Sequence, residues 1–181
     1  MKCRNFANLL IFVYLFCGVS FSYYLINFYM KYIPGNVFIN TIVASIAESA
    51  ASFVTGYIVK LLGARNGITC TNAVAGVATA VLWLAEINGL VKEVPFFILL
   101  AKFGVCSFFA MMYMSTLLYF PSRYLGAVFG ICNTAARATT ILAPMVAEID
   151  TPIPELSLIL ICIVAVVLSR LLVVPDDMKG I

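Results

Sequence analysis

Histidine is absent from this 181-residue chain, and charged residues make up only 10% of it. Without histidine there is no histidine metal site, no Ser-His or Cys-His catalytic pair and no histidine proton relay. The six cysteines form no Cys-x-x-Cys pair and mostly lie inside apolar stretches, which is typical of small hydrophobic residues rather than of a disulfide or zinc framework. Since paired catalytic carboxylates are also missing, we expect no enzymatic activity.

Phosphate-binding motifs are missing as well. The chain has neither a P-loop nor a Gly-rich phosphate cradle, so we expect no nucleotide and no other cofactor. Basic residues exceed acidic ones by only three, 11 against 8, and they are spread along the chain, which argues against a nucleic-acid partner. No Asn-x-Ser/Thr acceptor occurs, so N-glycosylation is not expected.

Hydrophobic residues dominate the chain instead, at 64% of the sequence, with a mean hydropathy of +1.08. This composition predicts an integral membrane protein in a lipid bilayer. Six apolar segments are long enough to span, and they fall at about 6–31, 37–62, 68–86, 94–119, 125–147 and 156–174. Because helices satisfy their own backbone in lipid, we predict an all-α, polytopic fold, a single six-helix transmembrane bundle over residues 1–181.

Turn residues separate the segments, among them Pro34-Gly35-Asn36 and the stretch from Gly63 to Gly67. An even number of spans places both termini on the same side of the membrane. That side holds most of the basic residues outside the spans: Lys2, Arg4, Lys60, Arg65, Arg123, Arg170 and Lys179. The other side holds Lys31 and Lys92 beside several acidic residues. The positive-inside rule therefore predicts cytoplasmic N- and C-termini.

Three charges remain at membrane depth, namely Glu48, Lys102 and Arg137. A guanidinium at the centre of a span costs roughly 2.5–3.5 kcal/mol on insertion scales. The seven Leu, Ile, Val and Phe residues from Leu125 to Val146 favour insertion by about 0.3–0.6 kcal/mol each. The insertion free energy of this span alone is therefore close to zero. Arg137 therefore needs neighbours that accept its charge, and such a residue typically serves a substrate or ion path.

Polar residues recur at helical spacing around these charges. The second span carries Thr41, Ser45, Glu48, Ser49, Ser52 and Thr55, and the fifth carries Gly126, Gly130, Asn133, Arg137, Thr140 and Pro144. The first span offers Tyr14, Ser20, Ser22, Tyr23 and Tyr24. Each set shares one helix face. We predict that the first, second, fourth and fifth spans line a polar interior, while the third and sixth pack outside it.

Each of these residues also has a purely structural interpretation. Ser45, Ser49 and Thr55, the tyrosines of the first span, and the Gly126-x-x-x-Gly130 pair are typical of simple helix packing. Lys102 has the length to snorkel to the membrane interface. Glu48 has two candidate cations, Arg137 and Lys102, for a structural ion pair.

Several short motifs resemble the organic ion transporters of the major facilitator superfamily. They are Leu100-Ala101-Lys102-Phe103-Gly104, Tyr119-Phe120-Pro121-Ser122-Arg123, Gly130-Ile131-Cys132-Asn133-Thr134-Ala135-Ala136-Arg137 and Ile141-Leu142-Ala143-Pro144. These resemble the tenth and eleventh helices of the family. Tyr23, Gly35-Asn36, Glu48 and Gly63-Ala64-Arg65 resemble its seventh and eighth helices and the loop that follows. The resemblance covers nearly the whole chain, but only the C-terminal half of the family fold.

The chain departs from the family in its cytoplasmic motifs. The acidic residue expected near Leu118 is replaced, Arg123 lies two residues before the usual arginine position, and the loop around Lys60 to Arg65 lacks its aspartate. In the family these loops gate conformational change, so the resemblance assigns gating positions to Lys60, Arg65 and Arg123. The departures favour an alternative, a non-transporting structural or assembly subunit derived from such a transporter.

The resemblance also implies a substrate site. Tyr23, Glu48 and Arg137 occupy positions that line the central cavity in the family, and we add Asn133 and Lys102 as substrate-binding candidates. Where organic cation transporters carry an aspartate, this chain has Arg137, as anion and carnitine-type relatives do. A fixed positive charge in a low dielectric attracts carboxylates and repels cations, which favours a small organic anion or zwitterion.

Transporters of this superfamily bind substrate between two six-helix halves and alternate access by rocking them. Six helices supply one wall, so we expect a missing N-terminal six-helix half or a partner chain. Three interpretations stay open: a fragment of a twelve-helix transporter, a half that pairs with another half or with itself, and a relic that serves as a scaffold. The expected membrane is the plasma membrane.

Overall fold

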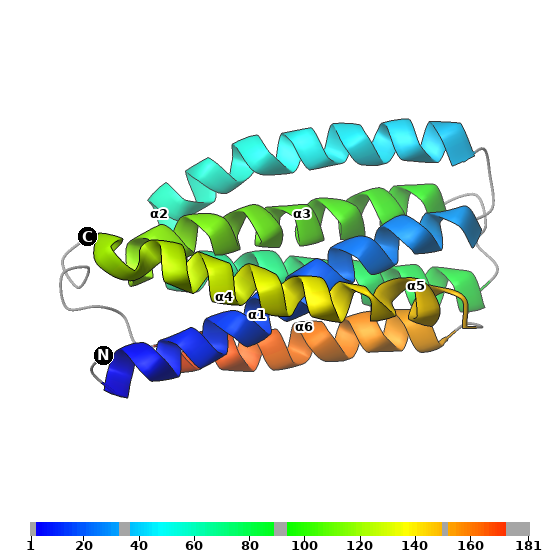
Figure 1. The fold of residues 1–181 in the computed structure, drawn as a ribbon. Helices are drawn as coiled ribbons and strands as arrows, with labels where there is room; N and C mark the ends of the chain where they lie inside the picture. Colours follow the sequence, from blue (N-terminus) through cyan, green and yellow to red (C-terminus); the bar gives the residue numbers. More distant parts are fainter. Residues whose placement is uncertain (1–2, 33–36, 89–93, 150–151, 173–181) are drawn as a thin grey trace.

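The computed structural model describes residues 3–32, 37–88, 94–149 and 152–172. Its elements in chain order are α1 (Cys3–Tyr29), η1 (Met30–Tyr32), α2 (Val37–Ile87), α3 (Val94–Tyr119), α4 (Ser122–Thr140), α5 (Leu142–Ala147) and α6 (Ile153–Leu171). The long helices lie alongside one another as a bundle (Figure 1). The turn predicted at residues 34–36, and Lys2, Lys92 and Lys179, lie outside the described residues.

Five helical segments of the described chain are long and apolar enough to cross a membrane. Their bounds are Phe6–Phe28, Thr41–Ala85, Phe96–Tyr119, Ser122–Ala147 and Ile153–Leu171. The second of them has 45 residues, whereas a single crossing takes roughly 20. The predicted class, an all-α polytopic membrane protein, is confirmed.

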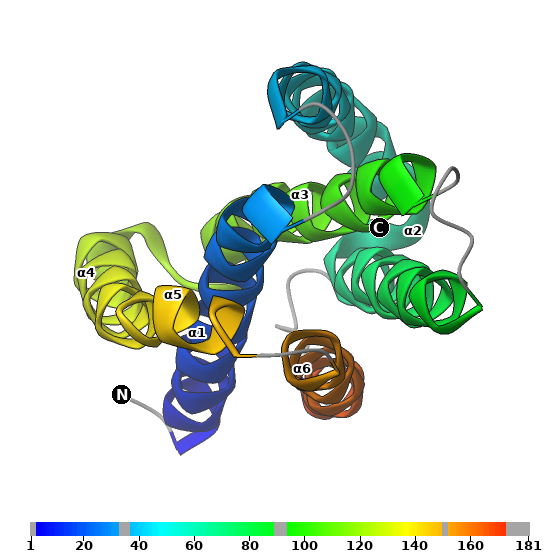
Figure 2. The same cartoon turned by 90° about the vertical axis from the view of Figure 1, so that its right-hand side faces the viewer.

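The long helix α2 is broken at Gly63, where φ is 73° and ψ is 169°. Residues with a Cβ rarely adopt this conformation, so glycine is required there. The break divides α2 into a first arm, residues 37–62, and a second arm, residues 64–87, which run antiparallel (Figures 1 and 2). The turn predicted from Gly63 to Gly67 is therefore wrong in extent, since residues 64–67 are already helical.

The predicted span at residues 125–147 also differs in detail. Helix α4 begins at Ser122, directly after Pro121, and a turn at Ile141 separates it from the short α5. Pro144 has no N–H to donate to the carbonyl of Thr140, which accounts for the interruption one turn before it. The membrane segment Ser122–Ala147 is thus two helical pieces rather than one.

Helix α1 lies at the centre of the bundle and contacts α3, α4, α5 and α6 (Figure 2). Its Phe12 and Phe16 side chains are fully buried. On one side of α1, the second arm of α2 and α6 are joined by two hydrogen bonds between helices. Thr69 and Ser169 share one of 2.8 Å, and the Asn72 amide donates to the Cys162 carbonyl at 2.7 Å. These two helices form the outer layer, away from α4.

Helix α3 packs closely against the second arm of α2 at Gly104. A Cβ at this position would lie 2.7 Å from the Ala75 Cα and 2.8 Å from the Ala75 nitrogen, closer than real Cβ atoms approach. Small residues at helix crossings let backbones approach in a membrane, where van der Waals packing drives association. The absence of a side chain at Gly104 therefore sets the distance between the two helices.

We predict that Gly104→Ala lowers the free energy of unfolding by about 1–3 kcal/mol, because overpacking forces the α3 and α2 backbones apart. Unfolding of the purified protein in mixed micelles, followed by circular dichroism, measures the change. Gly130→Ala is the matched control, since a Cβ there meets nothing within 4 Å. Equal effects of the two substitutions would contradict this account of the α2–α3 contact.

Candidate functional site

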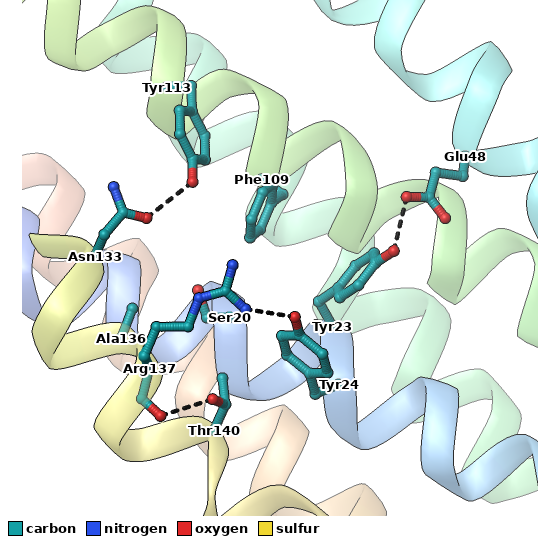
Figure 3. A pocket seen from close by; sticks show the side chains of 10 residues that line it. All are labelled: Ser20, Tyr23, Tyr24, Glu48, Phe109, Tyr113, Asn133, Ala136, Arg137 and Thr140. Carbon is teal, nitrogen blue, oxygen red and sulfur yellow. Dashed lines mark hydrogen bonds between the residues drawn. The ribbon is translucent and has the colours of Figure 1, made fainter. Parts of the chain in front are cut away.

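A pocket of about 230 Å³ opens among four helical segments, α1, the first arm of α2, α3 and α4 (Figure 3). Its lining residues are Ser20, Tyr23, Tyr24, Glu48, Phe109, Tyr113, Asn133, Ala136, Arg137 and Thr140. These segments are the first, second, fourth and fifth predicted spans. The helical periodicity of the sequence therefore predicted correctly which helices share a polar interior and which two lie outside it.

Arg137 lies on the α4 face that borders the pocket, and its side chain is exposed. Its Nη1 donates a hydrogen bond of 2.7 Å to the Tyr24 hydroxyl, and its guanidinium carbon lies 5.9 Å from the centroid of that ring. In the part of the chain that the structure describes, no carboxylate forms an ion pair with Arg137. A guanidinium has five N–H donors, so most of them remain for a ligand.

Glu48 approaches the pocket from the opposite side (Figure 3). Its Oε1 accepts a hydrogen bond of 2.8 Å from the Tyr23 hydroxyl. Its Oε2 lies 3.9 Å from the Lys102 ammonium, and its side chain is 42% exposed. The structural ion pair that we considered for Glu48 is thus formed with Lys102, whereas Arg137 has a neutral tyrosine as its partner.

Lys102 is buried, with 1% of its side chain exposed. Its ammonium donates to Asn27 Oδ1 at 2.5 Å and lies 4.0 Å from the Tyr23 ring centroid. The snorkelling interpretation is therefore wrong for this residue. Lys102 is also absent from the pocket lining, because Tyr23 lies between its ammonium and the open space. Lys102 lies behind the pocket wall that Glu48 and Tyr23 form.

Aromatic rings form the wall between the two charged sides. Phe109 packs on Tyr23 and on Tyr113, with centroids 5.5 Å and 5.2 Å apart, and Tyr113 stacks on Phe129 at 5.7 Å. The Tyr113 hydroxyl donates to Asn133 Oδ1 at 3.0 Å. Such a wall offers apolar and quadrupolar contacts to an organic ligand. No cluster of metal-ligating side chains occurs among the described residues.

Of the five predicted substrate-site residues, four line the pocket, namely Tyr23, Glu48, Asn133 and Arg137. The prediction did not include Tyr24, Asn27, Phe109 or Tyr113 among the site residues. Phe109 and Tyr113 follow Lys102 by seven and eleven residues and so share its helix face. That spacing was the available signal.

The three predicted gating residues lie near one end of the bundle, where α2 breaks, α3 meets α4 and α6 ends (Figure 1). Lys60 and Arg65 are helical residues on either side of Gly63, not loop residues, and Arg123 is in the first turn of α4. Arg65 donates to the main-chain carbonyl of Arg170 in the last turn of α6. The prediction of a loop at this position was therefore wrong for Lys60 and Arg65.

The glycine pair on α4 does not pack against another described helix. A Cβ at Gly126 or at Gly130 would meet nothing within 4 Å, so the close approach predicted from this pair is not made within the described chain. Ser45 and Ser49 on the first arm of α2 are likewise exposed, and each hydroxyl donates to the carbonyl four residues earlier. Of the three Ser and Thr residues with a packing interpretation, Thr55 alone follows it. Thr55 is buried, and its hydroxyl lies 3.4 Å from the Ser107 carbonyl oxygen on α3.

The fold and the pocket define a polytopic helical membrane protein with a polar cavity between its helices. No protein-family model matches the chain. It is 26% identical over 152 residues to "Solute carrier family 22 member 4" of Mus musculus, covering 79% of this chain and 26% of the mouse protein. It is 24% identical over 173 residues to "Putative transporter B0252.3" of Caenorhabditis elegans, covering 94% of this chain and 34% of that protein. The chain thus spans about a quarter to a third of the curated relatives that it matches.

We predict that Glu48→Gln destabilises the fold more than Lys102→Met does, by about 1–3 kcal/mol. The first substitution keeps an acceptor for Tyr23 but leaves the buried ammonium without its counter-charge, which is costly. The second leaves a carboxylate that is 42% exposed and open to water. Unfolding in mixed micelles measures both variants, and the reverse order would show that the Lys102–Glu48 contact carries no charge compensation.

Proposed function

We propose that this chain is the C-terminal six-helix half of a secondary transporter for small organic ions. The observation that carries the proposal is the Arg137 guanidinium, which lies at membrane depth on a pocket wall without a carboxylate partner in the described chain. Charges in membrane spans are kept where a substrate or ion path uses them. The similarity to two transporters supports this class of protein.

The pocket favours an organic anion or zwitterion as substrate. Arg137 has the planar, multiple-donor geometry that suits a carboxylate, and Tyr23 and Phe109 present rings to the organic body of the ligand. Asn133 adds an amide beside the guanidinium. Glu48, on the opposite side, contributes charge balance or proton coupling.

Transport by this chain requires a second wall, and the exposed faces beside the pocket suit one. On α4, Gly126 and Gly130 share the helix stripe of Arg137. On the first arm of α2, Ser45 lies one turn before Glu48, and Ser49 follows Ser45 by four residues on the same stripe. Small residues let another helix approach closely. We propose that an N-terminal six-helix half, on the same polypeptide or a separate one, covers both stripes, and that rocking of the two halves alternates access to the pocket.

The basic end of the bundle, with Lys60, Arg65, Arg123 and Arg170, faces the cytoplasm in this proposal, by the positive-inside rule. Both termini are then cytoplasmic, and the plasma membrane is the proposed location. The second candidate function is a non-transporting structural or assembly subunit. The observation that favours it is Arg65, which is tied to α6 at a position where a gating loop needs freedom to move.

We expect Arg137→Ala to weaken benzoate binding at least about tenfold while the fold is retained, because the variant loses the charge that holds the carboxylate. Equilibrium binding to the purified chain in nanodiscs measures the loss. Arg137→Lys should recover part of the affinity. Arg170→Ala is the matched control, since this arginine is exposed at the far end of α6. Equal affinities for Arg137→Ala and the control would remove the guanidinium from the site.

We expect Gly126→Leu to leave the stability of the chain unchanged, because nothing described lies within 4 Å of its Cβ position. In vesicles that also contain a matched six-helix N-terminal half, the variant should lose both co-purification with that half and benzoate uptake. Wild-type uptake that appears only with the partner supports the transporter. Co-purification with no uptake by the wild type supports the scaffold.

A further inference from the structure

We infer that Lys102, without touching the substrate, sets which sign of charge the pocket prefers by neutralising Glu48 from behind the pocket wall. The inference rests on the proposed function, since it concerns the selectivity of that same pocket. Lys102 is thereby a positioning residue rather than a binding one.

The geometry separates Lys102 from the pocket and joins it to Glu48. The ammonium is enclosed by the Asn27 amide oxygen at 2.5 Å, the Tyr23 ring at 4.0 Å and Glu48 Oε2 at 3.9 Å. Only 1% of the side chain is exposed, so a ligand in the pocket does not reach it. Glu48, by contrast, is 42% exposed and lines the pocket.

The charges near the pocket then have a definite sum. Among its described lining residues, the charged ones are Arg137 and Glu48, one of each sign. Taken alone, they would make the pocket neutral and indifferent to the sign of a ligand. Lys102 adds a positive charge 3.9 Å from the carboxylate, on the side of Glu48 that is buried in the protein. The local sum becomes positive, and the Glu48 carboxylate is turned toward Lys102 and Tyr23.

Tyr23 holds Glu48 and Lys102 in these positions. Its hydroxyl donates to one Glu48 oxygen while its ring face receives the Lys102 ammonium, so a single side chain fixes both charges. A cationic ligand that approaches Glu48 therefore competes with a donor and an ammonium that are already in place. An anion that approaches Arg137 meets a neutral group, the Tyr24 hydroxyl, which accepts from one of the five guanidinium donors, and no opposing charge among the described residues.

A matched pair of probes tests the inference. Benzoate and benzamidinium have nearly the same size and shape and opposite charge. Equilibrium dialysis with the purified full chain in nanodiscs gives the affinity for each, and their ratio is the charge selectivity. We expect wild type to prefer benzoate, Lys102→Met to shift the ratio about tenfold toward benzamidinium, and Glu48→Gln to shift it about tenfold the other way.

The double variant Lys102→Met/Glu48→Gln carries the decisive comparison, because it leaves no unpaired buried charge. We expect its selectivity to return close to that of wild type. If it equals that of Glu48→Gln alone, Lys102 has no electrostatic role at the pocket and the inference is overturned, even where the single Lys102→Met variant does not fold. A parallel loss of both affinities in Lys102→Met would also overturn it.

Failure of the proposed function has a different signature. In that case wild type binds neither probe, and Arg137→Ala causes no measurable change in affinity. Wild-type binding of benzoate with a ratio that ignores Lys102 leaves the transporter pocket in place and removes only the role inferred for Lys102. Arg170→Ala serves again as the control for loss of a cation remote from the pocket.

Discussion

The need to stabilise one ammonium inside the hydrocarbon region organises the centre of this bundle. Burying an ion costs several kcal/mol after relaxation, and Lys102 is 1% exposed. The structure offsets that cost with Asn27 and Tyr23 from α1 and Glu48 from the first arm of α2. Three helical segments are therefore fixed relative to one another at the same depth. The orientation of Tyr23, and with it one wall of the pocket, follows from this constraint.

Polar groups elsewhere in the bundle form hydrogen bonds either within their own helix or across to a neighbouring helix. Hydroxyls such as Ser45 and Ser49 bond to carbonyls of their own helix, which makes their face tolerable in lipid without a partner. Asn72 and Thr69 bond across to α6 and hold the outer layer. Arg137 differs from both groups, because one tyrosine hydroxyl satisfies only a fraction of its donors. Its guanidinium is also exposed beside an open pocket, where a ligand can reach the remaining donors, and this accessibility distinguishes the site from the buried structural contacts.

Sequence alone predicted the all-α membrane class and the helices that share the polar interior, because hydropathy and the 3.6-residue period are properties of each helix separately. It did not place Lys102 behind Tyr23, since periodicity gives the direction of a side chain and not the neighbour that lies there. Phe109 and Tyr113 were not predicted as site residues, because aromatic residues are common throughout this chain and do not by themselves indicate a site. The Gly126 and Gly130 pair indicated a close contact, yet no pattern within one chain tells whether the contacting surface belongs to that chain.

The break at Gly63 has a mechanical consequence. One residue connects the two arms of α2, so an axial slide of the arm that bears Glu48 cannot be absorbed by slack in a connecting loop. A slide by one helical turn, about 5.4 Å, would have to drag the second arm, which is hydrogen-bonded to α6 through Thr69 and Asn72. The two arms of α2 and α6 are thus connected in series, so such a slide at Glu48 would also displace the helices on the side of the bundle away from α4.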